Sequence, residues 1–489
     1  MSVTAPSLFA FEHSFAEELE GLYIEWTPDE VAEPSLIMFN DGLAQGLALD
    51  TAGLRSPAGV AALAGSSVPA GARPLAQAYA GHQFGGYSPR LGDGRAVLLG
   101  ELTDPSGVRY DLHLKGSGRT PFARGGDGKA VLGPMLREFL FGEAMHALGI
   151  PTTRALAVVA TGEEVARESM LPGAVLARVA ASHLRVGTFE CVAAAGKDEL
   201  LTRLVDYSVR RHVPDAVDES RRDQTLALLK YVIDRQAALI ADWMTVGFIH
   251  GVMNTDNVTI SGETIDYGPC AFMDVYDPAT VFSSIDHGGR YAYGNQPAIG
   301  AWNLSRLAET LITLVDDDID EAVAQLTEVL QAYPPAFAGH WLDRMRAKLG
   351  IVAGDDELDR ALADDLLDIL GEQDVDFTGA FRTLSSALRL DTAPSFIRPD
   401  DDAATAWYRR WSSRVAPDAA ERMDAVNPLY IARNHLVEEA LDAATAGDLQ
   451  PFNTLVDVLR SPFTDAGVDT RYELPAPADF GPYRTFCGT

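Results

Sequence analysis

Apolar and polar positions from residue 96 onward predict two neighbouring β-strands. Residues 96–102 are almost continuously apolar, and residues 109–115 alternate in polarity and end at Lys115. Between them, residues 104–107 read Asp-Pro-Ser-Gly, a combination that favours a tight turn. The pattern therefore predicts a hairpin with Lys115 at the end of its second strand.

Helical spacing of apolar residues follows this hairpin. Residues 136–148 carry the helical pattern, which stops at Gly149. Residues 155–160 predict another strand, and residues 225–244 predict a long amphipathic helix that leads toward His250. Residues 305–450 are mostly helical by periodicity, with an interruption at residues 334–335, where two prolines stand.

The order strand, strand, glycine-rich link, helix, strand is that of the small lobe of a protein kinase. We therefore expect an α+β fold: a protein-kinase-like bilobal fold with an N-terminal extension and an additional C-terminal helical region. The expected divisions are an extension of short helices and turns (1–85), a small lobe with nucleotide-binding loops (86–190), a large lobe with the metal and catalytic loop (191–330), and a helical region with an irregular tail (331–489).

Composition narrows the class of protein. The chain has 489 residues, 47% of them hydrophobic, which is enough for one large core or several ordinary ones. Its 70 acidic and 39 basic residues give a net charge of -31, which argues against nucleic-acid binding. Neither a secretory leader nor an apolar run of about 20 residues is visible. We expect a cytoplasmic protein with no membrane partner.

The most informative segment is residues 250–257, HGVMNTDN, followed by Asp266. Kinases with the pattern H-x-D-x-x-x-x-N use the Asp as base and the Asn as a magnesium ligand, and a later Asp binds a second magnesium. Here Asn257 and Asp266 keep oxygen ligands suited to Mg²⁺ or Mn²⁺, but Val252 stands where the base should be. Asp256 either acts as base from a shifted position or caps the loop.

Other kinase-like residues precede this segment, in the same order along the chain as in protein kinases. Gly92 and Gly94, followed by Arg95, form a turn that a phosphate could approach, although such turns are common. Lys115 and Glu138 stand where a kinase has its strand lysine and helix glutamate, although each alone reads as a surface charge. Their joint occurrence with the metal residues favours a nucleotide site.

Arg178 and Arg185 are separated by seven residues, which is two helical turns if the segment is helical. Both guanidinium groups would then face one site, where paired arginines suit phosphate oxygens. Surface arginines are the equally weighted alternative.

The sequence resembles the SelO or YdiU family of kinase-fold proteins that transfer AMP. The blocks that carry the resemblance are long and without gaps, and it extends over essentially the whole chain. They are YAGHQFG (79–85), LGDGRA (91–96), LKGSG (114–118), GDGKAVL (126–132), REFL (137–140), GIPTTRAL (149–156), HGVMNTDN (250–257), IDYGP (265–269) and NPLY (427–430).

The resemblance implies that ATP is the substrate and binds in an orientation flipped relative to kinases. AMP would pass to Ser, Thr or Tyr hydroxyls of proteins, with release of pyrophosphate. The nucleotide-binding residues implied are Gly92, Gly94, Arg95, Lys115, Asp127, Gly128, Arg178, Arg185 and Asp266. The resemblance further implies that Glu138 orients Lys115 and that Asp256 accepts the proton. Asn257 and Asp266 would bind the metal.

Three other functions stay open at this point. The chain could transfer UMP from UTP with manganese, or act as a phosphotransferase, for which a base would be needed at the position of Val252. It could also be a non-catalytic nucleotide-binding pseudokinase, in which Val252 marks lost activity.

Cysteine positions suggest a redox feature. Cys270 follows Asp266 by four residues, and Cys487 is third from the end, where some members of the family carry selenocysteine. We hypothesise a reversible disulfide between Cys270 and Cys487 that ties the tail over the active site. Two independent buried thiols are the alternative.

Overall fold

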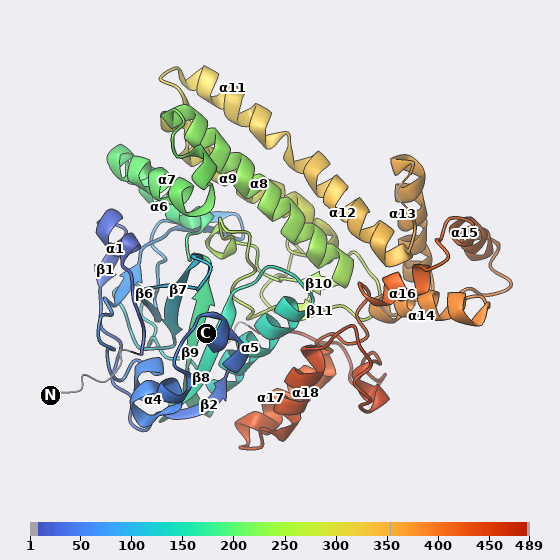
Figure 1. Ribbon diagram of the computed structural model, residues 1–489, viewed down its shortest axis with the longest axis horizontal. Helices are drawn as coiled ribbons and strands as arrows, with labels where there is room; N and C mark the ends of the chain where they lie inside the picture. Colours follow the sequence, from blue (N-terminus) through green and yellow to red (C-terminus); the bar gives the residue numbers. More distant parts are fainter. Residues whose placement is uncertain (1–7, 353, 487–489) are drawn as a thin grey trace.

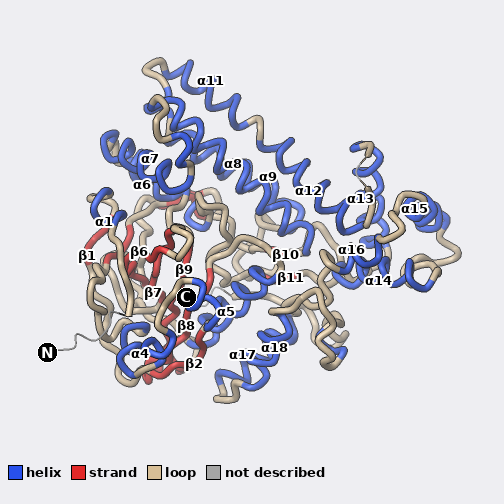
Figure 2. The backbone as a smooth tube through the Cα atoms, viewed as in Figure 1, coloured by secondary structure: helices blue, strands red, loops and turns tan. Residues whose placement is uncertain are grey.

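The computed structural model describes residues 8–352 and 354–486. Its main feature is a seven-stranded antiparallel sheet in the order β1-β3-β6-β7-β9-β8-β2, drawn in red in Figure 2. The strands are β1 (Tyr23–Glu25), β2 (Ser35–Phe39), β3 (Leu75–Gln77), β6 (Ala96–Thr103), β7 (Arg109–Lys115), β8 (Arg154–Ala166) and β9 (Met170–Ala180). The predicted hairpin is confirmed as β6 and β7, and the predicted strand at 155–160 lies within β8.

The first 85 residues contribute three strands to this sheet. The sequence predicted only short helices and turns there, and this was incomplete. Strands of three to five residues, such as β1 and β2, are too short to leave a clear alternating pattern. The expected short helices are present as α1 (Ser14–Glu18), α2 (Asp41–Gly46), α3 (Thr51–Arg55) and α4 (Pro57–Leu63).

The sheet is buried on both faces. Leu98 and Leu176 point toward α5 (Leu132–Ala147), and the residues next to them in sequence, such as Val97 and Val175, pack with the helices α3 and α4. Since side chains alternate between faces along a strand, burial of both faces explains the nearly continuous apolar run of β6. The predicted helix at 136–148 is confirmed by α5.

A helical region forms the rest of the chain (Figure 1). Its central element is α8 (Arg221–Val246), which ends at Gly247 in the left-handed conformation that glycine tolerates. This confirms the long helix predicted at 225–244. Around it lie α6 (Val186–Ala194), α7 (Asp198–His212), α9 (Gln296–Thr310), α10 (Ile312–Val315), α11 (Ile319–Leu330) and α12 (Tyr333–Leu349).

The C-terminal part is helical as predicted. It contains α13 (Asp356–Glu372), α14 (Phe377–Leu390), α15 (Asp402–Ser412), α16 (Ala419–Asp424), α17 (Asn434–Thr445) and α18 (Gln450–Leu459). The helices α13–α16 gather at the end away from the sheet, whereas α17 and α18 return to pack on α5 (Figure 1). The two prolines at 334–335 lie in the first turn of α12, where a missing amide hydrogen costs nothing.

Two short antiparallel strand pairs lie near the segment 250–257. The strands β10 (Phe248–Ile249) and β11 (Ala271–Phe272) pair at the two ends of the segment 250–270, and β4 (Gly81–Gln83) pairs with β5 (Gly86–Ser88). Short 3-10 turns occupy η1 (Pro214–Ala216), η2 (Thr255–Asn257), η3 (Tyr293–Asn295) and η4 (Thr470–Tyr472).

The fold is therefore mixed, with one main antiparallel sheet and a large helical part. A protein-kinase-like relation between these parts, and the four predicted divisions, remain predictions. In the described part of the chain, no helix is both long enough and apolar enough to cross a membrane.

Candidate nucleotide site

The loop between β10 and β11 holds His250 and Val252 in structural roles. His250 is buried, and its Nδ1 accepts the backbone N–H of Val252 at 3.4 Å. Its Nε2 therefore carries the hydrogen, which it donates to the Ile265 carbonyl at 2.9 Å. Val252 is buried in the main core, so an apolar side chain stands where a kinase has its base.

Asp266 lies at the centre of a group of cations. Its Oδ1 accepts hydrogen bonds from Lys115 Nζ at 2.6 Å and Arg178 Nη1 at 2.7 Å, and Arg185 Nη1 lies 3.3 Å from Oδ2. Burial alone would raise the pKa of this carboxyl, but the three cations hold it well below its usual range. The backbone φ of Asp266 is 63°, a left-handed conformation that is costly for a non-glycine residue.

Lys115 and Glu138 form a buried ion pair beside Asp266. Lys115 ends β7 and is 6% exposed, and Glu138 on α5 is 7% exposed. The alternative that Lys115 and Glu138 are solvent-exposed surface charges is therefore excluded. Because Arg178 Nη1 also lies 3.8 Å from Glu138 Oε2, the two carboxylates and the arginine form one connected group.

The segment that carries Arg178 and Arg185 is not helical, so the two side chains do not share a helix face. Arg178 lies in β9, and Arg185 directly precedes α6. A strand followed by a turn still brings both guanidinium groups to Asp266. Arg185 also lies 4.5 Å from the centre of the Tyr79 ring and donates to the Asp256 carbonyl at 2.9 Å.

Asp256 lies in η2, next to this group of charges. Burial raises the pKa of its carboxyl to about 6, while Arg185 and a hydrogen bond from Gln83 oppose the increase. Gln83 Nε2 donates to Oδ2 at 3.2 Å. The other oxygen, Oδ1, is buried and has no hydrogen-bond partner among the residues that the structure describes. Such an atom can accept a proton or contact a cation.

The loop between β10 and β11 offers few oxygen atoms for a divalent metal ion. Asn257 donates its amide nitrogen to the Val252 carbonyl at 3.0 Å, which leaves its amide oxygen as the candidate ligand. Within residues 8–352 and 354–486, no group of three or more His, Cys, Asp or Glu side chains could hold a metal by itself. Mg²⁺ commonly uses only one or two protein oxygens and completes its shell with nucleotide phosphates and water. The amide oxygen of Asn257 and the carboxylate of Asp266 fit that arrangement, and Asp256 Oδ1 is a buried oxygen without a hydrogen-bond partner among the described residues.

The glycine turn at 92–95 packs against the glycine-rich segment at 116–131. A Cβ on Gly92 would lie 2.5 Å from the Phe122 ring, and one on Gly94 would lie 3.0 Å from the Phe122 carbonyl. Glycine is therefore required at position 92 for this close approach. The Arg95 carbonyl accepts the Gly116 N–H at 2.7 Å.

Asp127 and Gly128 lie in the outer part of the glycine-rich segment. Asp127 is exposed and forms an ion pair with Arg167 at 2.8 Å, which lowers the pKa of its carboxyl. Gly128 has a φ of 74° and lies against the Arg119 backbone. Among the described residues, neither Asp127 nor Gly128 forms a hydrogen bond or ion pair with Asp266.

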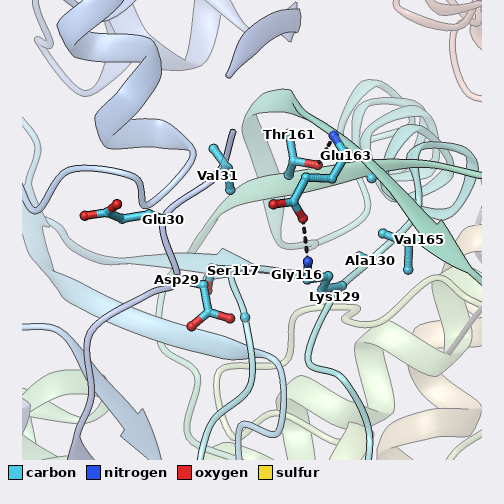
Figure 3. Close-up of a pocket in the computed structure, with 12 residues that line it drawn as sticks. Asp29, Glu30, Val31, Gly116, Ser117, Lys129, Ala130, Thr161, Glu163 and Val165 are labelled. Atoms are coloured by element: carbon cyan, nitrogen blue, oxygen red, sulfur yellow. Dashed lines mark hydrogen bonds and ion pairs between the residues drawn. The ribbon is translucent and has the colours of Figure 1, made fainter. Parts of the chain in front are cut away.

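A small pocket opens beside this segment. It is lined by residues that include Asp29, Ser117, Lys129 and Glu163, and Figure 3 shows Glu163 reaching Lys129. That ion pair measures 2.5 Å. None of the predicted site residues lines this pocket, so it is separate from the charged group around Asp266.

Sequence reasoning missed the hairpin of β4 and β5, which contacts residues 254–256 of the loop between β10 and β11. The His82 N–H donates to Thr255 Oγ1 at 2.6 Å, and Glu190 accepts from both the Thr255 hydroxyl and the His82 ring. A Cβ on Gly81 would lie 2.6 Å from Asp256 Oδ1, so only glycine permits this approach. The glycines at 85 and 86 signal a turn, but no local pattern reveals a contact between residues 173 positions apart.

Cys270 is buried, and its thiol donates to the Tyr267 carbonyl at 3.2 Å. Burial raises the pKa of this thiol to about 12. Cys487 lies outside the described residues, so the disulfide remains a prediction. The described part of the tail does reach this region, because the Thr485 hydroxyl donates to the Pro269 carbonyl at 2.7 Å.

Comparisons with known proteins identify the family of this chain. Residues 7–460 match the sequence model of the family described as "Protein adenylyltransferase SelO". Proteins called "Protein nucleotidyltransferase YdiU" from Mycolicibacterium smegmatis and Cereibacter sphaeroides are 57% and 56% identical to this chain. The first alignment covers 100% of both chains, and the second covers 98% of this chain and 100% of the relative. A third such protein, from Mycolicibacterium paratuberculosis, is 54% identical, with 100% of both chains covered.

The match extends through every element of the site, from the β4 and β5 hairpin to the loop that carries Asp266. As the resemblance predicted, the chain belongs to the SelO family of nucleotidyltransferases.

Proposed function

We propose that this protein transfers AMP from ATP to Ser, Thr or Tyr hydroxyls of other proteins and releases pyrophosphate. One observation carries the proposal: three buried cations converge on Asp266 beside a loop that has no base at position 252 but has, at Asp256, a buried carboxylate oxygen without a hydrogen-bond partner among the described residues. The family match and the names of the relatives support the same class of reaction.

Phosphate binding follows from the balance of charge. Lys115, Arg178 and Arg185 bring three positive charges against the two negative charges of Glu138 and Asp266. The convergence of three cations suits a triphosphate, and the forked arginines can each contact two phosphate oxygens. We place the β- and γ-phosphates here, which leaves the α-phosphate toward Asp256.

Chemistry at the α-phosphorus needs a proton acceptor near the hydroxyl. In our proposal the acceptor oxygen bonds to the α-phosphorus, its proton passes to the Asp256 carboxylate, and the bond from the α-phosphorus to the bridging oxygen breaks. Pyrophosphate leaves with the electron pair of that bond, held by Lys115 and the two arginines. These cations stabilise the leaving group because its charge develops where they already lie.

Asn257 and Asp266 are the proposed ligands of Mg²⁺ or Mn²⁺. A bound divalent ion supplies neutralisation of phosphate charge. The Lys115 to Glu138 pair between a strand and a helix supports a protein-kinase-like bilobal fold, since kinases position their lysine in this way.

The test is incubation of the protein and a cell extract with ATP labelled on either the α- or the γ-phosphate, with Mg²⁺ or Mn²⁺ supplied. We expect the α-label alone to enter protein and to be lost in Asp256→Asn and Asp266→Asn. These variants preserve side-chain shape while removing the charge. The matched control is Asp317→Asn, an exposed aspartate before α11, which should label as wild type does.

Other outcomes separate the alternatives. Entry of the γ-label would identify a phosphotransferase, and entry of neither label would indicate a nucleotide-binding protein without transfer. More incorporation from α-labelled UTP than from ATP would identify UMP as the group transferred. Full labelling by Asp256→Asn would contradict its role as proton acceptor.

A further inference from the structure

The polar face of β7 points into the protein. Asp111, His113 and Lys115 alternate with Leu112 and Leu114, and all five side chains are buried. In a half-exposed strand the polar positions would face water. Lys115 bonds to Asp266, and His113 is the next residue on the same face of β7.

His113 lies directly opposite Arg178 in the register of β7 and β9. Its Nδ1 is 3.3 Å from Arg178 Nη2, and its Nε2 is 2.9 Å from Asp93 Oδ2. A guanidinium only donates hydrogen bonds, and an ionised carboxylate only accepts them. His113 is therefore neutral, with its hydrogen on Nε2 and its lone pair on Nδ1 directed at Arg178.

The electrostatics around His113 agree with this tautomer. Burial lowers the pKa of the imidazole, Asp93 opposes that effect, and Arg178 and Arg185 reinforce it. The ring of His183 stacks on that of His113 with centres 4.4 Å apart. A proton on Nδ1 would place two donors face to face, so the neutral ring is the form that holds Arg178.

Asp93 is itself firmly held. Its Oδ2 accepts the Gln77 N–H of β3 at 3.0 Å, and its backbone carbonyl accepts the Thr120 hydroxyl at 2.5 Å. Asp93 also belongs to the glycine turn that starts at Gly92. The chain of contacts thus runs from that turn, through His113, to Arg178 and Asp266.

We propose that Asp93 and His113 are positioning residues that fix the guanidinium of Arg178 in the orientation needed to bind the phosphate tail of the nucleotide. This inference rests on the proposed function, because it gives Arg178 a phosphate to bind. Arg178 Nη1 is bound to Asp266, and the lone pair of His113 fixes Nη2, so the guanidinium plane cannot rotate. Its Nε has no partner among the described residues.

Two substitutions at position 113 separate the hydrogen bond that the imidazole donates to Asp93 from the one that it accepts from Arg178. In His113→Gln the amide nitrogen can still donate to Asp93, but the acceptor next to Arg178 is lost. In His113→Asn an amide oxygen near the former Nδ1 can still accept from Arg178, but the donor to Asp93 is lost. The control is His183→Asn, which removes the ring stacked on His113 but no hydrogen bond to Arg178. His183 is also buried, and its Nδ1 lies 3.1 Å from Asp111 Oδ2, so this variant tests the effect of lost packing alone.

Calorimetry would measure the Kd of ATP and of AMP for each variant, and thermal unfolding would confirm that each variant folds. For His113→Gln we expect the Kd of ATP to rise about tenfold, the loss typical of one hydrogen bond to a charged group, while the Kd of AMP is unchanged. His113→Asn should show a smaller increase, and His183→Asn should bind ATP as wild type does. A KM increase with little change in kcat is expected in the labelling assay.

The results separate this inference from the proposed function. If Arg178→Ala weakens ATP binding but His113→Gln does not, or if His183→Asn weakens it equally, the positioning role is wrong. If Arg178→Ala leaves the Kd of ATP unchanged, the phosphate role of Arg178 and the inference both fail. If the binding results are as expected but no α-label enters protein, the positioning role stands and the transfer reaction is wrong.

Discussion

Two buried lysines in this protein have opposite surroundings. Lys115 is 6% exposed and lies between the carboxylates of Glu138 and Asp266. Lys348 on α12 is 5% exposed and forms no ion pair within the described part of the chain; its Nζ lies 3.9 Å from the centre of the Phe381 ring. Burial, with the nearby Arg382, lowers the pKa of Lys348 to about 7.

The difference shows what identifies a site in this fold. Burial of a cation is common to both lysines and therefore marks neither as functional. Lys115 belongs to a group in which five charged side chains converge from β7, β9, α5 and two loops, whereas Lys348 is an isolated cation in a core of helices. Convergence of charges from separate elements is what a bound anion requires.

The largest effect is expected from Lys115→Met. The substitution removes a cation from the proposed phosphate site while preserving an unbranched side chain. We expect transfer of α-label to fall at least about 100-fold, the loss typical of removing one preorganised electrostatic contact. Label incorporation under saturating ATP would measure it, with Lys348→Met as the matched control that should retain activity. Retention of most activity by Lys115→Met would contradict the assignment of Lys115, and not Lys348, to the phosphate site.

The next effect is on stability. Lys348→Met should stabilise the protein by up to about 3 kcal/mol at pH 7, because a buried ammonium without a carboxylate partner is replaced by an apolar side chain of similar length. Thermal unfolding at pH 7 would measure the difference as a higher Tm. A lower Tm would indicate that the contact with the Phe381 ring outweighs the cost of burial.

The difference in stability between Lys348→Met and the wild type should depend on pH. The pKa of Lys348 falls from 10.5 to about 7 on folding, so between these values the unfolded chain binds a proton that the folded chain does not. Wild-type stability therefore gains from rising pH in this window, and the advantage of Lys348→Met should shrink by about 1.4 kcal/mol per pH unit above 7. Paired melts at pH 7, 8 and 9 would measure it, and a constant difference would contradict the assignment.

The smallest effect is expected from Lys129→Met. Lys129 is partly exposed and paired with Glu163 at the small pocket of Figure 3. Exposed ion pairs contribute about 0 to 1 kcal/mol, so stability should change little. Transfer of α-label should also stay within about threefold of wild type, since the residue lies outside the charged group. A loss comparable to that of Lys115→Met would extend the site to the glycine-rich segment.

Parts of this structure follow from local sequence. The hairpin of β6 and β7 and the helices α5 and α8 were predictable because turn residues and apolar periodicity act over a few neighbours. The sequence left open whether the segment around Arg178 is helical, because a short apolar run does not distinguish a strand from a helix. Pairing of β9 with β7 and β8 decided between them.

The candidate site also contains some residues that the sequence predicts and others that only the structure reveals. Residue types and spacing were enough to single out Lys115, Glu138, Asp256 and Asp266. They did not reveal Asp93, His113 or Gln83, because the partners of each are distant in sequence and belong to other elements. His113 in particular sits in an alternating strand, where the pattern alone suggests an exposed polar face.

Short-range sequence pattern is enough to predict the family, the order of the candidate site residues and the local elements that carry them. Only the tertiary structure decided that the polar face of β7 is buried, that Arg178 and Arg185 meet at Asp266 from a strand and a turn, and that a hairpin near residue 83 contacts Asp256. The physical reason is that contacts between distant segments form when several elements bury their apolar faces together, and the energy of that packing is absent from any single segment.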